Sequence, residues 1–162
     1  TGASRGPPPN PAAYDIILLG FRGNPFPYVA RAALSVLPSL TEGFPMAVCE
    51  ALASGVPVAS ADCPTGPREI LAPATSPTQV ATAPEWAEFG LLLPQLGQGA
   101  QPAAVAPAWA AALAELLGDP SRYAHYVAQA HQRAKAFGPQ PVMGAWEQLL
   151  QASARNSTKL SL

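Results

Sequence analysis

Short apolar runs, each followed by proline or glycine, recur along the first half of the chain and predict buried strands. Residues 34–37 read Leu-Ser-Val-Leu and stop at Pro38, and residues 56–59 read Val-Pro-Val-Ala. Between these runs, residues 46–54 are mostly apolar or small and predict a helix that Pro45 opens and Gly55 ends. A strand, a helix and a second strand in close succession predict a βαβ unit of a parallel sheet.

The same pattern predicts the remaining elements. Residues 14–21 contain the run Ile-Ile-Leu-Leu and predict a further strand, followed by a short helix at 26–33 and the first turn of another helix at 67–71. Residues 72–84 predict a loop, and residues 95–107, with glycine, glutamine and proline, predict a connector. Apolar residues at helical spacing predict three C-terminal helices, with faces formed by Trp109, Leu113, Leu116 and Leu117; by Tyr123, Val127, Ala130, Ala134 and Phe137, before Gly138; and by Val142, Trp146, Leu149 and Leu150.

Composition fits one domain and argues against several classes of function. A chain of 162 residues can bury one core of ordinary size. Its net charge of −1 gives no sign of binding to nucleic acid or to an anionic membrane. No apolar run approaches the roughly 20 residues of a transmembrane helix, and no signal peptide opens the sequence. We expect a cytoplasmic protein with a disordered leader at 1–13, a domain at 14–151 and a flexible tail at 152–162.

Two glutamates are the main candidates for a binding site. Glu42 lies in a Gly/Pro loop, and Glu50 lies on a predicted helix whose neighbouring positions are apolar or small. A carboxylate on such a helix is costly unless a polar group faces it, so the pair indicates a ligand with hydroxyl groups and negative charge. Parallel sheets bind ligands beyond the carboxyl ends of their strands, where Ser39, Gly43 and Asp62 also belong. The alternatives are an ordinary loop acid and a helix-surface glutamate.

The start of the same helix is suited to an anion. The amides of Gly43, Phe44 and Met46 lie at a predicted helix N-terminus, which offers free N–H groups and the positive end of the helix dipole. Gly43 also allows a ligand to approach the backbone closely. We expect these amides to receive a phosphate, and the alternative is a plain helix entry loop.

Three motifs resemble the donor-binding domain of the family 4 glycosyltransferases. They are Gly-Phe-Arg-Gly-Asn-Pro at 20–25, the stretch from Glu42 to Glu50 with seven residues between the glutamates, and Asp-Cys-Pro-Thr-Gly-Pro-Arg-Glu-Ile-Leu at 62–71. Gly-Leu-Leu-Leu-Pro at 90–94 and the helices up to Leu150 are similar to the C-terminal end of the same family. The resemblance covers most of the chain, from about residue 15 to about residue 150.

The resemblance implies a fold and an activity. The fold is a Rossmann-like parallel sheet with flanking helices, here part of the C-terminal half of a two-domain transferase. The activity is transfer of a hexose or N-acetylhexosamine, with retention, from a UDP- or GDP-linked donor to a glycan or lipid-linked acceptor, without a metal or cofactor. Glu42 is then catalytic and contacts the transferred sugar. The implied donor-binding residues are Glu50, which accepts the ribose hydroxyls, and Ser39, Asn24, Gly43, Phe44, Met46, Gly66 and Arg68.

Other polar residues keep two interpretations. Arg68 either helps to hold a phosphate or an acceptor group, or forms a surface salt bridge with Glu69 or Asp62. Asn24 either shapes the turn near the base or is an ordinary turn asparagine before Pro25.

Cysteine and histidine give no sign of a metal site or of a disulfide framework. Cys49 and Cys63 are expected to be small buried residues, with lining of the site as the alternative for Cys63. His125 and His131 stand six positions apart on one predicted helix, so they do not share a face and are expected to be solvated.

The sequence also departs from the family pattern. Family members run to several hundred residues, begin with an acceptor-binding half and open the donor half with two βα units that are not found here. The alternative function is therefore a truncated, non-catalytic nucleotide-binding or interaction module, and a third reading is an α/β protein with an accidental motif. We expect no transfer by these 162 residues alone, contact with an inner membrane face only through the missing half, and self-association through an uncovered strand edge.

Overall fold

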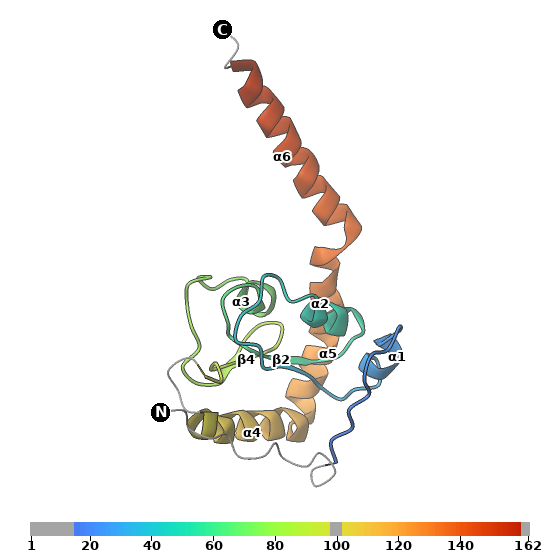
Figure 1. Ribbon diagram of the computed structural model, residues 1–162, viewed down its shortest axis with the longest axis vertical. Coiled ribbons are helices and arrows are strands. Elements are labelled where there is room, and N and C mark those ends of the chain that lie inside the picture. Colours follow the sequence, from blue (N-terminus) through green and yellow to red (C-terminus); the bar gives the residue numbers. More distant parts are fainter. Residues whose placement is uncertain (1–14, 98–101, 160–162) are drawn as a thin grey trace.

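The computed structural model describes residues 15–97 and 102–159, so the expected leader at 1–13 lies outside the described residues. It shows a mixed α/β fold, as the sequence predicts, with a mainly parallel sheet between helices (Figure 1). The described elements are α1 (Phe26–Val29), β1 (Ser35–Leu37), α2 (Met46–Ala53), β2 (Val58–Ala61), α3 (Pro67–Leu71), β3 (Glu85–Trp86), β4 (Leu91–Leu93), α4 (Pro102–Gly118), α5 (Pro120–Ala134), η2 (Lys135–Phe137) and α6 (Pro139–Lys159).

The four strands lie in the order β1-β2-β4-β3. β1 runs parallel to β2 with Ser35 opposite Val58, and β2 runs parallel to β4 with Ala59 opposite Leu91. Only β3 is antiparallel, and it pairs with β4 at the far edge. The carboxyl ends of β1, β2 and β4 therefore share one edge of the sheet, which is where parallel sheets bind ligands.

Side chains of the central strands alternate between two apolar layers. Val58 and Leu92 face one cluster, which α2, α3 and α5 complete. Leu91 and Leu93 face a second cluster, which α4 completes with Trp109 and Ala112. All four residues of β2 are buried, as expected for a parallel strand covered on both faces. The sheet is thus held rigidly from both sides, and its loops start from fixed positions.

The βαβ unit forms as predicted. Helix α2 begins at Met46 directly after Pro45 and ends at Ala53, before Gly55, whose φ of +75° is the left-handed conformation that stops a helix. Its buried side chains include Leu52, which packs in the cluster under β2. The strands predicted at 34–37 and 56–59 are observed as β1 and β2, the second shifted by two residues.

The strand predicted at residues 14–21 is wrong for the part that is described. Residues 16–20 have no strand or helix, and the side chains of Ile17 and Leu18 are 79% and 80% exposed. An apolar run becomes a strand only when a neighbour accepts its backbone hydrogen bonds. Among the described residues, β1 pairs with β2 alone, and no segment offers residues 16–19 such a neighbour.

The remaining differences concern element boundaries. The run at 91–93 is a strand, and Glu85–Trp86 is a two-residue strand beside it, within a stretch of sequence without a strand signal of its own. Helix α4 begins at Pro102, inside the expected connector, and α6 continues through residues 152–159 of the expected tail. Figure 1 shows α6 extending away from the sheet, and its exposed residues include Trp146 and Leu150.

Candidate functional site

Three loops meet at the carboxyl edge of the sheet. They follow β1, β2 and β4, and they carry residues 38–45, 62–66 and 94–97. The side-chain amide of Gln95 donates to the carbonyl of Leu40 at 3.1 Å, which joins the third loop to the first. The indole N–H of Trp109 donates to the carbonyl of Pro94 at 2.8 Å and ties the third loop to α4. The edge is therefore a connected surface.

The first and second loops are joined by a ladder of hydrogen bonds. The amide of Glu42 donates to the carbonyl of Pro64 at 3.1 Å, and the amide of Thr65 donates back to the carbonyl of Glu42 at 3.0 Å. The Thr65 hydroxyl lies 2.9 Å from the carbonyl of Gly43 and 3.2 Å from that of Glu42, and it shares its one hydrogen between them. These bonds hold the backbone on both sides of the Glu42 side chain.

Gly66 allows the two loops to approach this closely. Its φ is +100°, in the region that favours glycine, and a Cβ there would lie 2.4 Å from Cδ of Pro45. The amide of Gly66 donates to the carboxylate of Glu69 at 3.2 Å, which fixes the start of α3. Gly66 is buried, so it shapes the site through its backbone.

The predicted anion site has two open amides. Gly43 and Phe44 are exposed, and neither amide donates a hydrogen bond to another described residue. The amide of Met46 instead donates to the carbonyl of Phe44 at 2.9 Å, so it is engaged in the turn and does not fit the predicted phosphate contact. The positive end of α2 and the amides of Gly43 and Phe44 remain suited to an oxyanion.

The two glutamates lie on different parts of this edge. Glu42 is half-buried in the loop after β1, and Glu50 is half-buried on α2. Glu50 lines a cavity of about 410 Å³ whose other walls are mostly apolar and come from α2, η2 and the start of α6, with Phe44, Met46, Phe137 and Val142 among them. A carboxylate at the rim of an apolar cavity can accept hydrogen bonds from a ligand's hydroxyl groups while the cavity takes its apolar part.

Ser39 and Asn24, which the sequence also predicts to bind the donor, lie at different distances along the chain from Glu42 and have different surroundings. Ser39 is half-buried at the start of the loop after β1, on the same edge as Glu42. Asn24 is exposed, and its side-chain oxygen accepts a hydrogen bond from the amide of Phe26 at 3.2 Å. That bond favours the interpretation of Asn24 as a turn residue that starts α1.

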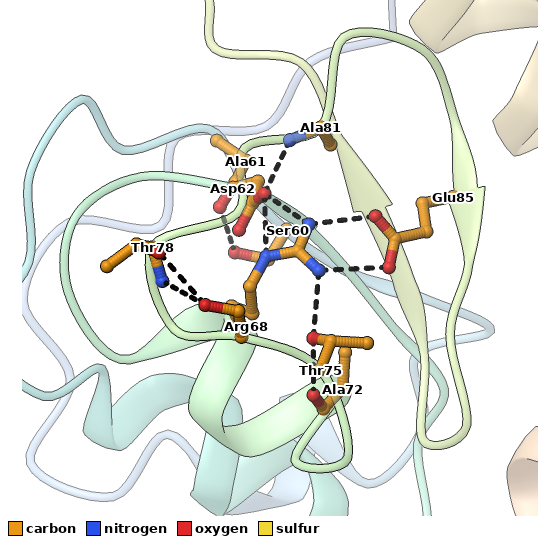
Figure 2. A network of polar contacts seen from close by, with 10 residues as sticks. Ser60, Ala61, Asp62, Arg68, Ala72, Thr75, Thr78, Ala81 and Glu85 are labelled. Atoms are coloured by element: carbon orange, nitrogen blue, oxygen red, sulfur yellow. Dashed lines mark hydrogen bonds and ion pairs between the residues drawn. The ribbon is translucent and has the colours of Figure 1, made fainter.

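Arg68 forms a buried network of ion pairs and hydrogen bonds. Its side chain is 4% exposed, and that of Asp62, one of its two carboxylate partners, is 3% exposed (Figure 2). Nε and Nη2 donate to Asp62 Oδ2 at 3.1 and 2.5 Å, and Nη1 and Nη2 donate to the two oxygens of Glu85 at 3.0 and 2.8 Å. Nη1 also donates to the hydroxyl of Thr75 at 3.0 Å.

These bonds engage all five N–H groups of the guanidinium. Arg68 therefore does not fit the predicted role in holding the donor. The alternative interpretation was a surface salt bridge with Glu69 or Asp62. The salt bridge with Asp62 forms, but it is buried, and Glu85 is the second partner of Arg68. The hydrogen bonds that Arg68 donates to Glu85, and then those to Asp62, raise the pKa of Arg68 above its ordinary value.

The network also fixes the loop after α3. The amide of Ala81 donates to Asp62 Oδ2 at 2.6 Å, and the Thr75 hydroxyl donates to the carbonyl of Ala72 at 2.8 Å (Figure 2). Residues 72–84 are thus held against the loop after β2. Sequence reasoning missed Glu85 and Thr75, because nothing near either residue marks it as a partner for a distant arginine.

Both cysteines are buried and free, as expected for small core residues. Burial raises the pKa of the Cys49 thiol and also of the Cys63 thiol, where the nearby charge of Glu42 adds to the effect. Cys63 lines a second cavity, of about 270 Å³, between the loop after β2 and residues 77–80. A protonated thiol is a weak nucleophile, so neither cysteine suits covalent chemistry.

Within 15–97 and 102–159, no group of His, Cys, Asp and Glu has an arrangement that would hold a metal ion, and His125 and His131 are both exposed. In the described part of the chain, no helix is long and apolar enough to cross a membrane.

Several curated proteins are similar to parts of this chain. An uncharacterized glycosyltransferase of Methanocaldococcus jannaschii is 41% identical over 78 residues, which are 48% of this chain and 19% of that protein. An exopolysaccharide phosphotransferase of Streptomyces coelicolor is 34% identical over 121 residues, 74% of this chain and 11% of that protein. A lipopolysaccharide 1,6-galactosyltransferase of Salmonella typhimurium is 37% identical over 62 residues, 36% of this chain and 17% of that protein. The chain therefore spans less than a fifth of each of these relatives.

Solved structures share the fold. The pneumococcal O-GlcNAc transferase GtfA, in complex with UDP and GlcNAc, matches 87% of this chain and 25% of its own with a TM-score of 0.65 and 20% identity. The sucrose-phosphate synthase of Thermosynechococcus elongatus matches 78% of this chain and 27% of its own with a TM-score of 0.54 and 26% identity. The family model described as "Glycosyl transferases group 1" matches residues 8–119, more than half of the sequence, and the chain belongs to that family.

Proposed function

We propose that this chain is the donor-binding part of a retaining glycosyltransferase of family 4. The observation that carries the proposal is the arrangement of Glu42 and Glu50 around the start of α2, with the open amides of Gly43 and Phe44 between them in the chain. That order offers a carboxylate for a sugar, N–H groups for a phosphate and a carboxylate for a ribose diol. A nucleotide-diphosphate sugar carries these groups in the same order.

Each residue then has a chemical role. Glu50 accepts hydrogen bonds from the ribose hydroxyls, the amides of Gly43 and Phe44 bind the distal phosphate, and Glu42 accepts hydrogen bonds from hydroxyls of the transferred sugar. The donor is a UDP- or GDP-linked hexose or N-acetylhexosamine, and the acceptor is a glycan or a lipid-linked sugar. The names of the bacterial relatives, which concern lipopolysaccharide and exopolysaccharide, support an acceptor of that class.

The proposed chemistry is electrostatic and positional. The anomeric bond to the diphosphate breaks while the acceptor oxygen attacks from the same face, and the departing phosphate oxygen takes the acceptor's proton. The chain stabilises the charge that develops on the diphosphate and fixes the sugar. This route needs no metal and no cofactor. We place the reaction in the cytoplasm or at the inner face of a membrane.

A second candidate function is nucleotide-sugar binding without transfer. The exposure of Gly43 and Phe44 favours it, because the described residues supply nothing that covers a donor bound there. Transfer requires a second binding surface that closes over the reacting groups and excludes water. The two functions share the donor site and differ in turnover.

Calorimetric titration of the chain with UDP and GDP and their hexose conjugates tests the donor site. Charge-assisted hydrogen bonds contribute about 1.5–3 kcal/mol, so Glu50→Ala is expected to weaken nucleoside diphosphate binding by about tenfold or more, and Glu50→Gln by less. Glu147→Ala, which removes an exposed carboxylate from α6, is the matched control and should bind normally. Unchanged affinity in a well-folded Glu50→Ala variant would remove Glu50 from the site, and no binding of any nucleotide by the wild-type chain would overturn the donor-binding proposal. Sugar transfer by the natural polypeptide that contains these residues separates the enzyme from the binding module.

A further inference from the structure

We propose that Thr65 is a positioning residue that sets the orientation of Glu42 toward the transferred sugar of the donor. This inference rests on the proposed function. Thr65 lies on a different loop from the residues it would position, 23 positions away from Glu42 along the chain. It contributes no group to the donor site as proposed, and it acts through the backbone that it holds.

The contacts concentrate on the backbone around the glutamate. The Thr65 hydroxyl shares its one hydrogen between the carbonyls of Gly43 and Glu42, and the Thr65 amide donates to the carbonyl of Glu42. The amide of Glu42 donates to the neighbouring carbonyl of Pro64. Hydrogen bonds with Pro64 and Thr65 therefore hold the peptide groups on both sides of the Glu42 side chain.

Without these bonds, the loop after β1 has few restraints of its own. Glu42 is only half-buried, and Gly43 is exposed and has no side chain to pack. Glycine loses more freedom than any other residue when it is ordered. The hydrogen bonds that join Glu42 and Gly43 to Pro64 and Thr65 therefore act as a clamp. They set the fraction of time that the loop spends in one conformation.

The clamp itself has a rigid base. Asp62 begins the second loop, Arg68 follows that loop in α3, and the two residues are buried and joined by hydrogen bonds. Gly66 packs against Pro45 so closely that a Cβ would lie 2.4 Å from the proline ring. Thr65 lies between Asp62 and Gly66 in the chain. Because both of these residues are buried and held in place, the Thr65 hydroxyl stays within hydrogen-bonding distance of the Gly43 carbonyl.

We assign the positioning role to the hydroxyl of Thr65 and not to the size of its side chain. Thr65→Val keeps the shape and removes the donor, while Thr65→Ser keeps the donor and removes the methyl group. Loss of the hydroxyl loosens the contact between Glu42 and the sugar, whereas Glu50 stands on the separate helix α2 and keeps its place. We therefore expect a loss in the chemical step and little loss in nucleotide affinity.

The first test is amide hydrogen exchange, measured by NMR on the 162-residue chain. The Glu42 amide donates to Pro64, so its protection reports on the joined loops. Protection of that amide should fall by about tenfold or more in Thr65→Val and by less than about threefold in Thr65→Ser. Equal protection in wild type and Thr65→Val overturns the inference, and so does an equal loss in both variants.

The second test is sugar transfer by the natural polypeptide that contains these residues. We expect Thr65→Val to lower kcat by about tenfold, with less than a threefold change in affinity for the nucleoside diphosphate, and Thr65→Ser to recover most of kcat. In a Glu42→Ala background, Thr65→Val should have no further effect, because the group that it positions is gone.

The outcomes separate the two proposals. Full transfer activity of Glu42→Ala overturns the assigned role of Glu42, and this inference with it. Normal kcat of Thr65→Val beside a strongly impaired Glu42→Ala overturns the inference alone. Additive losses in the double variant also overturn it, since they would show that Thr65 acts on something other than Glu42.

Discussion

Residues 16–19 and residues 34–37 are both short apolar runs, yet only the second forms a strand. Residues 35–37 pair in parallel with β2, and the Leu37 side chain packs against the main core. The first run is the more apolar of the two, but its Ile17 and Leu18 side chains lie in the open. The difference shows that apolar character alone does not make a strand, because each strand needs a partner for its backbone and a layer for its side chains.

The same contrast separates the candidate site from the rest of the surface. The loop after β1 begins at a paired strand, and bonds from Thr65 and Gln95 hold it in place. Within the described part of the chain, residues 16–20 form no helix or strand, and no backbone hydrogen bond holds them in place. A ligand site needs side chains held in one geometry, so the paired edge of the sheet is the region that can carry one.

We expect the largest effect on the free energy of unfolding in a comparison of two arginines, Arg68 beside the candidate site and Arg22 beside the unpaired run. Arg68→Ala leaves Asp62 buried without its charge partner, and loss of one partner from a buried pair costs about 3–5 kcal/mol. Arg22→Ala removes an exposed arginine next to the unpaired run and should change the free energy of unfolding by less than about 0.5 kcal/mol. Urea denaturation measures both. A loss below about 1 kcal/mol for Arg68→Ala would show that the network is not a structural support.

Two leucines give the next comparison. Leu92 on β4 is fully buried, so Leu92→Ala should cost about 2–5 kcal/mol through lost burial and the cavity left behind. Leu18 is 80% exposed, and Leu18→Ala should change stability by less than about 0.5 kcal/mol. Thermal and urea unfolding of the two variants provide the measurement. A cost for Leu18→Ala close to that for Leu92→Ala would mean that residues 16–19 are packed in solution.

The packing of α5 on the sheet predicts a pH effect. Burial raises the pKa of Tyr126 to about 12 from an ordinary value near 10, and its hydroxyl donates to the carbonyl of Ala87 at 2.9 Å. A raised pKa means that the folded state favours the protonated form, so the stability is complete below pH 10 and is lost as the pH rises toward 12. The loss should be on the order of 2 kcal/mol.

Denaturation curves recorded from pH 9 to pH 12 test this effect. Tyr126→Phe should be less stable than wild type at neutral pH, because the Ala87 carbonyl loses its donor, and should show a weaker decline at alkaline pH. An identical alkaline decline in wild type and Tyr126→Phe would assign the pH dependence to other groups.

The smallest expected effect on stability concerns the exposed run itself. Replacing Ile17 and Leu18 with serine should leave the free energy of unfolding nearly unchanged and should reduce self-association of the chain. Sedimentation velocity at several concentrations compares the variant with wild type. A strictly monomeric wild type would contradict the idea that this run, or the edge of β1 that pairs with no other described strand, is an uncovered interaction surface.

Sequence reasoning predicted what depends on local pattern. The βαβ unit from Leu34 to Ala59, the stop at Gly55 and the C-terminal helices follow from apolar spacing and from glycine and proline chemistry. The joining of Glu42 to Thr65 and of Arg68 to Glu85 did not follow, because these contacts link residues far apart in the chain. No local pattern encodes such pairings, which arise only when parallel strands bring their loops to one edge.

The alternatives for single residues were decided by hydrogen bonds, some to distant residues and some to near neighbours in the chain. Arg68 and Asn24 each had a binding and a structural interpretation, and the hydrogen bonds of both favour the structural one. Met46 was expected to offer its amide, but the turn before α2 uses that amide within the chain. Glu42, Glu50, Ser39, Gly43 and Phe44 stay predictions that the geometry is compatible with.

The most direct test of the account compares two ligands on one variant. Glu42 is proposed to contact only the transferred sugar, so Glu42→Ala should weaken binding of the nucleotide sugar by about tenfold or more and leave the matching nucleoside diphosphate within about twofold. Calorimetric titration of both ligands into the same protein, with Glu147→Ala as the control, measures this difference. Equal losses for the two ligands, or no loss for either, would contradict the assignment of Glu42 to the sugar and with it the proposed donor site.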